Sequence, residues 1–344
     1  MILLRILLYP MAMAYNFITG LRNRLYDRGL KPSVSFELPV INVGNLTVGG
    51  TGKTPLIEYL IRLLAPNRKV ATLSRGYGRT TTGFRIAGPM DNAATLGDEP
   101  TQFYQKYGDR VTVAVGEERA LAIPSILQDH PDMEIILLDD AYQHRKVRPS
   151  LNILLSDYNR PFYDDLLLPA GRLRESRHGA ARADVVVVTK CPPEISDDEM
   201  MDIDQQVRRY VEKPVFFTHV RYGNPMPVTV RAQKLGDEVV LVTGIANAKP
   251  LVHYLKQTFN LVKHFDFTDH HTYRASDLED FAGALKAHPK ASFLTTEKDK
   301  VKLASPFFQE AIEKIPLFYL PIEVEFIKNG QDFDEMVLNH LKRA

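Results

Sequence analysis

Residues 43–55 read VGNLTVGGTGKTP and decide the fold. An apolar run ends near Val43, a loop rich in glycine follows, and a helical run begins at Pro55, which suits the first turn of a helix. Small residues let backbone N–H groups wrap a phosphate, and the next helix adds the positive end of its dipole. The order of strand, loop and helix therefore predicts a phosphate-binding loop. The bland alternative is a glycine turn without function, since Thr47 stands where the strict pattern has glycine.

Each residue of this loop has an expected task. Lys53 would reach the β- and γ-phosphates of a nucleotide, and the Thr54 hydroxyl would ligate Mg²⁺. The residues expected to wrap the phosphates are Gly49, Gly50, Thr51 and Gly52.

A phosphate-binding loop needs an acidic partner for its magnesium ion. Residues 135–140 read IILLDD, an apolar strand that ends in Asp139 and Asp140. Beside the loop in a parallel sheet, this is where such an acid lies. A single acid after a strand is more often a helix cap, but two acids downstream of the loop favour the metal site.

The rest of the chain alternates between β-rich runs and amphipathic stretches. The runs are nearly continuous in Val, Ile and Leu, as expected for parallel strands covered on both faces. The pattern predicts an α/β fold with a doubly wound, mostly parallel sheet. The expected strands are 40–43, 70–73, 111–115, 135–138, 151–155 and 185–189, with helical stretches at 55–64 and 118–128.

A second, smaller group of predicted strands and helices follows a change in the sequence pattern. Residues 220–235 read as two short strands around a Gly-Asn-Pro turn, a hairpin-like linker. Beyond it, we expect strands at 239–243, 262–265 and 292–295, and helices from about 250 and at 275–287.

Composition excludes several classes of protein. With 344 residues, the chain is long enough for about two domains. Lys+Arg 43 against Asp+Glu 42 gives a net charge of +1, so no basic field argues for a nucleic-acid partner. Cys191 is the one cysteine, which rules out an intramolecular disulfide and zinc sites built from several cysteines.

The first fifteen residues, MILLRILLYPMAMAY, are apolar except for Arg5. The run is shorter than the roughly 20 residues of a spanning helix. Because four basic residues follow between positions 22 and 31, we favour a helix lying in a membrane interface. The alternatives are a core helix and a signal peptide, although export would separate the nucleotide motif from ATP.

Further motifs complete a recognisable set. They read SRGYGR at 74–79, GDEP at 97–100, DDAYQHR at 139–145, PAGRLRE at 169–175, FTDHH at 267–271 and TTEKD at 295–299. With the phosphate-binding loop, they resemble the tetraacyldisaccharide 4'-kinases, the lipid A 4'-kinases of Gram-negative bacteria. The resemblance runs from the N-terminal apolar segment to about residue 302.

The resemblance implies a P-loop kinase at the cytoplasmic face of the bacterial inner membrane, bound peripherally. Such a kinase moves the γ-phosphate of ATP, with Mg²⁺, to the 4'-hydroxyl of a tetraacyl glucosamine disaccharide 1-phosphate. Its partners would be this acylated lipid and the membrane surface. The sequence leaves the oligomeric state open.

The resemblance also implies roles for single residues. Asp98 looks like the catalytic base and His270 like its partner, with the adjacent His271 as the rival histidine. Asp139, Asp140 and Glu175 look like acids of the metal site. It further implies that Gln143 and His144 lie behind the ligating residues or on the nucleotide side. Apart from the resemblance, phosphoryl transfer requires positive charge, and Arg75, Arg79 and Arg174 in these motif segments can supply it for phosphate or substrate. The departures from the family pattern are Thr268, Ala141 and Ser176, none of which removes a chemical group.

The expected organisation has five parts. These are a membrane-interface helix at 1–30, a P-loop kinase domain at 31–219, a two-stranded linker at 220–236, a smaller α/β domain at 237–325, and a C-terminal helix at 326–344 that can pack back on the first domain.

The runner-up is a membrane-associated P-loop ATPase switch of the partitioning type. Those proteins carry a lysine just before the two glycines of the loop, and this chain has Val48 there.

Overall fold

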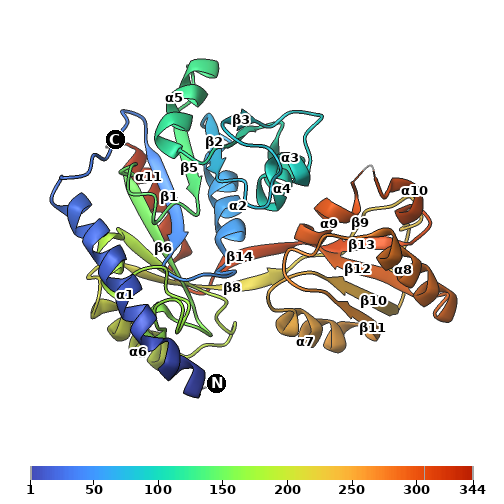
Figure 1. The fold of residues 1–344 in the computed structure, drawn as a ribbon. Helices are drawn as coiled ribbons and strands as arrows, with labels where there is room; N and C mark the ends of the chain where they lie inside the picture. Colours follow the sequence, from blue (N-terminus) through green and yellow to red (C-terminus); the bar gives the residue numbers. More distant parts are fainter. Residues whose placement is uncertain (1, 306, 343–344) are drawn as a thin grey trace.

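The computed structural model describes residues 2–305 and 307–342, and it contains two sheets with helices around each (Figure 1). Residues 1, 306 and 343–344 fall within the expected segments 1–30, 237–325 and 326–344, and they lie outside the described residues.

The larger sheet has nine strands in the order β14-β8-β7-β6-β1-β5-β2-β4-β3. All neighbours are parallel except β3 on β4 and β14 on β8. The strand that precedes the phosphate-binding loop, β1, lies between β5 and β6. The strands are β1 (Val40–Asn45), β2 (Val70–Ser74), β3 (Arg85–Ile86), β4 (Val111–Val115), β5 (Ile135–Asp139), β6 (Leu151–Asp157), β7 (Val185–Thr189), β8 (Val215–Tyr222) and β14 (Ile322–Phe326).

Helices cover both faces of this sheet, which confirms the doubly wound fold. On one face, α2 (Lys53–Leu64), α4 (Asp98–Tyr107) and α11 (Gly330–Leu341) pack their apolar residues against Ile41 and Val43. On the other face lie α5 (Arg119–Asp129) and α6 (Asp197–Arg208). The short helices are α3 (Ala93–Leu96), η1 (Phe162–Asp164) and η2 (Arg177–Arg182).

The smaller sheet has five strands in the order β11-β10-β12-β13-β9, parallel except for β9. It is covered by α7 on one face and by α8, α9 and α10 on the other. Its strands are β9 (Met226–Pro227), β10 (Glu238–Thr243), β11 (Asn260–Asp266), β12 (Ser292–Thr296) and β13 (Leu317–Leu320). Its helices are α7 (Lys249–Thr258), α8 (Ala275–Ala287), α9 (Glu297–Leu303) and α10 (Gln309–Ile312).

Two strands connect the sheets, but they differ from the hairpin expected within 220–236. The chain leaves the larger sheet through β8 and returns through β14, and these two strands pair antiparallel, with Tyr222 opposite Ile322 (Figure 1). The second short strand of the expected hairpin, β9, pairs with β13 instead. A local turn pattern cannot reveal a partner that lies a whole inserted sheet further along the chain.

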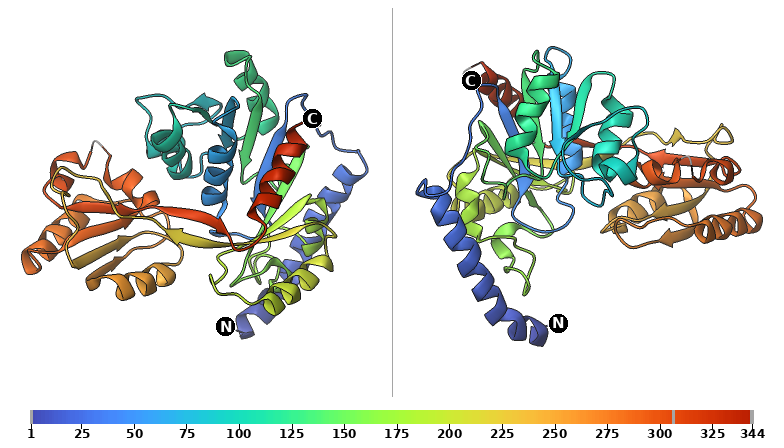
Figure 2. Two further views of the ribbon diagram at one scale, coloured as in Figure 1. Left: turned by 180° about the vertical axis from the view of Figure 1, so that it is seen from behind. Right: turned by 45° about the horizontal axis from the view of Figure 1, so that its top comes forward.

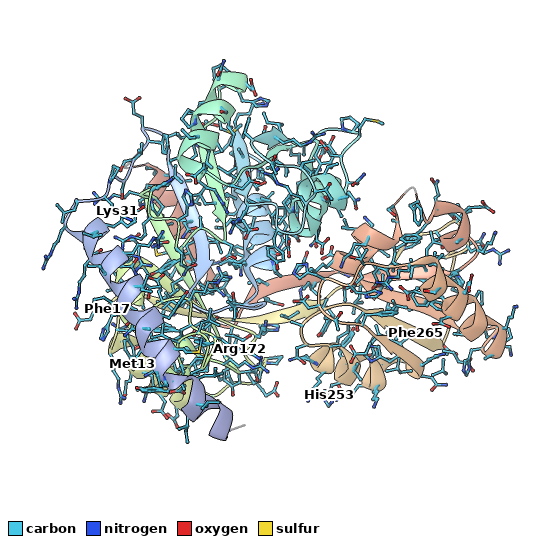
Figure 3. All side chains as sticks on the ribbon, in the orientation of Figure 1. Met13, Phe17, Lys31, Arg172, His253 and Phe265 are labelled. Atoms are coloured by element: carbon cyan, nitrogen blue, oxygen red, sulfur yellow. The ribbon has the colours of Figure 1, made fainter. Side chains whose placement is uncertain are left out.

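The N-terminal helix α1 (Ile2–Asp27) lies beside the part of the molecule that contains the larger sheet. Its N-terminal end projects beyond that part (Figure 1 and Figure 2). Ala12 and Tyr26 are buried, whereas most of its large apolar side chains are exposed. Figure 3 marks two of them, Met13 and Phe17, and Phe17 is 72% exposed. Among the described residues, no helix is both long and apolar enough to cross a membrane.

Candidate active site

The loop between β1 and α2 is anchored to the end of β7. Thr189 Oγ1 donates a hydrogen bond to the Thr51 carbonyl at 2.8 Å, and Lys190 Nζ donates to the Gly50 carbonyl. Gly52, the N-cap of α2, has no side chain with which to cap the helix, so the first N–H groups of α2 are open to an anion. The left-handed glycines of the loop are Gly49 (φ 109°) and Gly52 (φ 83°).

Lys53 and Thr54 are the first two residues of α2 and follow this loop directly. Lys53 Nζ lies 3.8 Å from Asp140 Oδ1, so the cation of the loop and the acid after β5 are neighbours. The expected juxtaposition of loop and acids at one edge of the sheet is therefore present.

Asp139 is the last residue of β5 and is buried. Burial raises its pKa to about 7, against the opposing charge of Lys53. Its Oδ2 accepts a hydrogen bond from Ser74 Oγ at 3.3 Å, but its buried Oδ1 has no hydrogen-bond partner. A buried carboxylate oxygen without a partner is a suitable ligand for a hard cation such as Mg²⁺.

Asp140 has the opposite electrostatic situation. Burial raises its pKa, but the charges of Lys53 and Arg174 outweigh this, and the net pKa is below the ordinary value. Arg174 binds both of its oxygens, at 2.9 and 3.0 Å. Asp140 therefore stays ionised, and its left-handed backbone (φ 51°) is the kind of strain that marks functional sites.

Glu175 lies outside this pair of acids. Its Oε1 accepts hydrogen bonds from Arg182 at 2.7 Å and Gln143 at 3.0 Å, and its Oε2 accepts one from Asn23 of α1 at 2.6 Å. Among the described residues, no three His, Cys, Asp or Glu side chains gather as a metal-binding group. The oxygens of Glu175 are thus occupied by Arg182, Gln143 and Asn23, and a role for Glu175 as a third acid of the metal site stays a prediction.

Gln143 links this second cluster to the first. Its Nε2 donates to the Asn45 carbonyl at 2.9 Å, and its Oε1 accepts from Arg174 Nη1 at 3.3 Å. The neighbouring His144 is half-buried, and burial together with Arg119 lowers its pKa to about 4. His144 is therefore neutral at physiological pH.

The three expected arginines have different surroundings. Arg75 is exposed. Arg79 is buried, where it binds Glu117 and the Gly83 carbonyl. Arg174 is held by Asp140, as described above. Arg75 is the most exposed of the three.

Asp98, on a helix that covers the larger sheet, and His270, in the loop after β11 of the smaller sheet, are in direct contact. His270 Nδ1 lies 3.0 Å from Asp98 Oδ2. Asp98 is the first residue of α4, and its side chain is 13% exposed against 33% for His270. The preceding Gly97 (φ 94°) could not carry a Cβ, which would lie 2.8 Å from the Tyr77 carbonyl. The Tyr77 ring, in turn, lies 5.4 Å from the imidazole of His270.

The rival histidine has another partner. His271 Nε2 lies 2.9 Å from Asp277 Oδ2 of α8, and its ring stacks on Phe267. His271 thus contacts α8, a helix that covers its own sheet, whereas His270 contacts α4, a helix that covers the larger sheet.

Three cations near these groups were not expected from the sequence. Arg119, at the start of α5, is buried, and the charges of Asp139 and Asp140 act on it. Lys298 and Lys302 of α9 lie beside His270 and Asp98. Arg119 could have been found from its position just after a buried strand, and the lysines from the TTEKD motif and its continuation.

Comparison with known families gives a consistent result. A sequence model of the family described as tetraacyldisaccharide-1-P 4'-kinase matches residues 4–342. A tetraacyldisaccharide 4'-kinase from Flavobacterium johnsoniae is 45% identical over 345 residues, which cover 99% of this chain and 98% of that protein. One from Bacteroides thetaiotaomicron is 41% identical, covering 97% and 93%.

A solved structure is also similar over its whole length. The crystal structure described as the "apo" form of LpxK from Aquifex aeolicus in complex with ATP has a TM-score of 0.77 and 27% sequence identity. The match covers 98% of this chain and 99% of that chain.

Proposed function

This chain belongs to the tetraacyldisaccharide 4'-kinase family, and on that premise we propose that it transfers the γ-phosphate of ATP to the 4'-hydroxyl of a tetraacyl glucosamine disaccharide 1-phosphate. This is a step of lipid A biosynthesis. The observation that carries the proposal is the contact between Asp98 and His270, since it joins an acid–base pair from two sheets. Glu99, next to Asp98, also acts on the pKa of Asp139, which ties this pair to the nucleotide side.

We assign the base of this pair to the imidazole rather than to the carboxylate expected from the sequence. Burial raises the pKa of Asp98, but His270, Lys302 and Lys298 outweigh this and hold it below the ordinary value. A carboxylate stabilised in this way is a poor proton acceptor. His270 is the more exposed partner, and its Nε2 faces away from Asp98, so the carboxylate orients the ring and Nε2 takes the proton.

The reaction can be written so that every proton and bond is accounted for. The 4'-hydroxyl gives its proton to His270 Nε2 while its oxygen forms a bond to the γ-phosphorus. The bond from the γ-phosphorus to the bridging oxygen breaks, and ADP leaves. The imidazolium, stabilised by Asp98, then returns its proton to water. Positioning and positive charge supply most of the remaining rate enhancement.

The nucleotide side rests on the loop of residues 49–54. Its N–H groups and Lys53 would bind the phosphates, with Gln143 and His144 nearby and with Arg75, Arg79 and Arg174 supplying charge around them. Thr54, Asp139 and Asp140 have the oxygen donors that suit Mg²⁺, whose chemistry here is to neutralise phosphate charge. Glu175 contributes by fixing Gln143 and, through it, Arg174.

We also propose that the parts of the chain work as domains on a membrane surface. The kinase domain at 31–219 would hold ATP, and the smaller domain at 237–325 would bring His270 to the acceptor. The exposed apolar side chains of α1 support peripheral binding to the cytoplasmic face of the bacterial inner membrane, where the acylated substrate resides.

One assay tests the function directly. The purified protein is incubated with γ-labelled ATP and the tetraacyl disaccharide 1-phosphate, and the lipid is then chromatographed. We expect label in a lipid that carries one more phosphate, and loss of that label in Lys53→Ala. Release of labelled inorganic phosphate without labelled lipid would instead favour an ATPase and refute the kinase.

A further inference from the structure

The outer nitrogen of His270 already has a partner in the protein. Lys298 Nζ, from α9, lies 3.0 Å from His270 Nε2. The two ring nitrogens of His270 are thus bracketed by a carboxylate on one side and an ammonium group on the other. This arrangement bears directly on the base assigned above, and the inference drawn from it rests on that proposed function.

Lys298 is held on this nitrogen by two carboxylates. Its Nζ lies 3.3 Å from Asp269 Oδ1 and 3.5 Å from Glu99 Oε1. An ammonium group has three N–H donors and no acceptor. Asp269 Oδ1 and His270 Nε2 lie within hydrogen-bond distance of two of these donors, and Glu99 lies within ion-pair distance of the same ammonium group.

The direction of the hydrogen bonds follows from these partners. Because the ammonium can only donate, Nε2 must be the acceptor and carry no proton. The ring proton is then on Nδ1, where it is donated to Asp98. Without Lys298, the imidazole would lie between Asp98 and Asp269, whose Oδ2 is 4.0 Å from Nε2, and two carboxylates favour a protonated ring.

We propose that Lys298 is a positioning residue that keeps His270 neutral, with the lone pair of Nε2 available as the base. When the 4'-hydroxyl arrives, it replaces one N–H of Lys298 at Nε2. The ammonium remains bound to Asp269 and Glu99, so the exchange costs it a single hydrogen bond. The proton then moves from the hydroxyl to Nε2 as in the reaction above.

Other charged groups surround this pair and define what the test must separate. Lys302 lies one helical turn from Lys298, but its Nζ is 3.4 Å from Asp98 and therefore acts on the carboxylate end. The Tyr77 ring lies 5.4 Å from the imidazole and is tilted by 59° to it. The titratable and charged groups around His270 are Asp98, Glu99, Asp269, Lys298, Lys302 and Tyr77.

The test compares Lys298→Met, Lys298→Arg and the parent protein by two measurements. In ¹⁵N spectra of the histidine rings near neutral pH, we expect Nε2 of His270 to be unprotonated in the parent and protonated in Lys298→Met. In the pH profile of kcat/KM, we expect the acid limb to move to higher pH in Lys298→Met, because the cation that opposes protonation of the ring is lost. Activity should recover at alkaline pH, and Lys298→Arg should restore most of the parent profile.

A matched control comes from the same helix. Lys300 Nζ donates a hydrogen bond to Gln105 Oε1 at 2.8 Å and not to His270. Lys300→Met therefore removes a lysine from the same helix without changing the contacts of His270, and the acid limb of the kcat/KM profile should stay in place. If Lys298→Met fails to fold, Lys298→Gln serves the same comparison. A loss of activity that is equal at every pH, with the ring still neutral, would overturn the proposal and leave Lys298 a purely structural residue.

Failure of this inference can be told apart from failure of the proposed function. If His270→Ala keeps its turnover, the assigned base is wrong whatever Lys298 does. If His270→Ala is inactive and the acid limb of Lys298→Met does not move, the base stands and only the role of Lys298 is lost.

Discussion

At the scale of single residues, Asp98 and His270 form one unit whose members can be tested together. Asp98→Ala and His270→Ala should each lower turnover by about 10²–10⁴-fold, because each removes part of one proton transfer. The double variant should be scarcely worse than the poorer single variant, since groups that act as a unit are not additive. ATP affinity should stay near that of the parent protein.

The control for this pair is His271→Ala, which removes a histidine bonded to Asp277 instead. We expect it to keep most of its turnover. If His271→Ala is the inactive variant and His270→Ala is not, the histidine assignment is wrong by one position.

His144 gives a prediction about stability and pH. Its pKa is lowered from about 6.5 to about 4, mainly by burial and then by Arg119. The neutral ring is therefore favoured in the folded state, and its contribution to stability is complete above pH 6.5. As the pH falls from 6.5 toward 4, the unfolded chain takes up a proton that the folded chain does not, and this stability is lost.

The measurement is urea unfolding of the parent protein and His144→Gln over pH 4 to 8. Between pH 6.5 and 4, we expect the free energy of unfolding of the parent to fall more steeply with pH than that of His144→Gln. The difference in slope should correspond to the uptake of at most about one proton on unfolding. Parallel curves for the two proteins would mean that His144 titrates normally.

At the scale of elements, α1 combines two contacts that can be separated. Its inner side binds the site, through Tyr15 to the Arg174 carbonyl at 2.8 Å and through Asn23 to Glu175. Its outer side exposes Leu7 and Phe17. Leu7→Glu with Phe17→Glu should release the protein from anionic phospholipid vesicles and raise the KM for the lipid far more than for ATP.

Asn23→Ala is the matched change on the inner side of α1. It should leave vesicle binding intact and lower turnover by freeing Glu175, which otherwise fixes Gln143. Unchanged vesicle binding in the Leu7→Glu, Phe17→Glu variant would contradict the membrane role.

The strands were the most predictable elements. Residues 111–115 and 185–189 match β4 and β7 at both ends, because runs of β-branched residues in a sheet buried on both faces leave little choice. The helix α4 was not predicted, since its sequence DEPTQFYQKY has few apolar residues and begins with the GDEP motif. The partner of β8 was unpredictable for a different reason, because it depends on a return of the chain after the second sheet.

The site divides in the same way. Lys53, Thr54, Asp139 and Asp140 follow from local order alone, because the ends of neighbouring parallel strands meet at one edge. The contacts of Lys298 with His270 and of Glu175 with Asn23 depend on docking between distant elements, and no spacing along the chain encodes it.

At the scale of the whole molecule, α4 joins the two sheets at both of its ends. Asp98 begins the helix and meets His270, while Lys106, two turns later, binds Glu297 of α9 at 2.8 Å. Lys106 also binds Glu58 of α2 at 2.6 Å. Burial raises the pKa of Glu58, against the charge of Lys106. Lys106 thus neutralises one buried acid from each side of the interface.

Lys106→Met should therefore destabilise the protein by about 3 kcal/mol, because it leaves buried acids without their cation. Urea unfolding at pH 7 measures this loss, which should shrink at lower pH as the acids take up protons. Adding Glu58→Gln to Lys106→Met should recover part of the stability. A double variant as unstable as Lys106→Met alone would mean that Glu58 does not need the charge of Lys106.

The antiparallel pair of β8 and β14 has a consequence for the order in which the two parts of the protein can fold during synthesis. Phe333 and Val337 of α11 pack beside α2, and Tyr59 of α2 donates a hydrogen bond to Asp334 at 2.7 Å. The helix that carries Lys53 is thus covered by segments that leave the ribosome only after the entire inserted sheet. The smaller sheet has its own core and can fold before the edge strand of the larger sheet, β14, has been synthesised. A nascent chain halted after β13 should accordingly protect the later-made half from protease and leave the earlier-made half open.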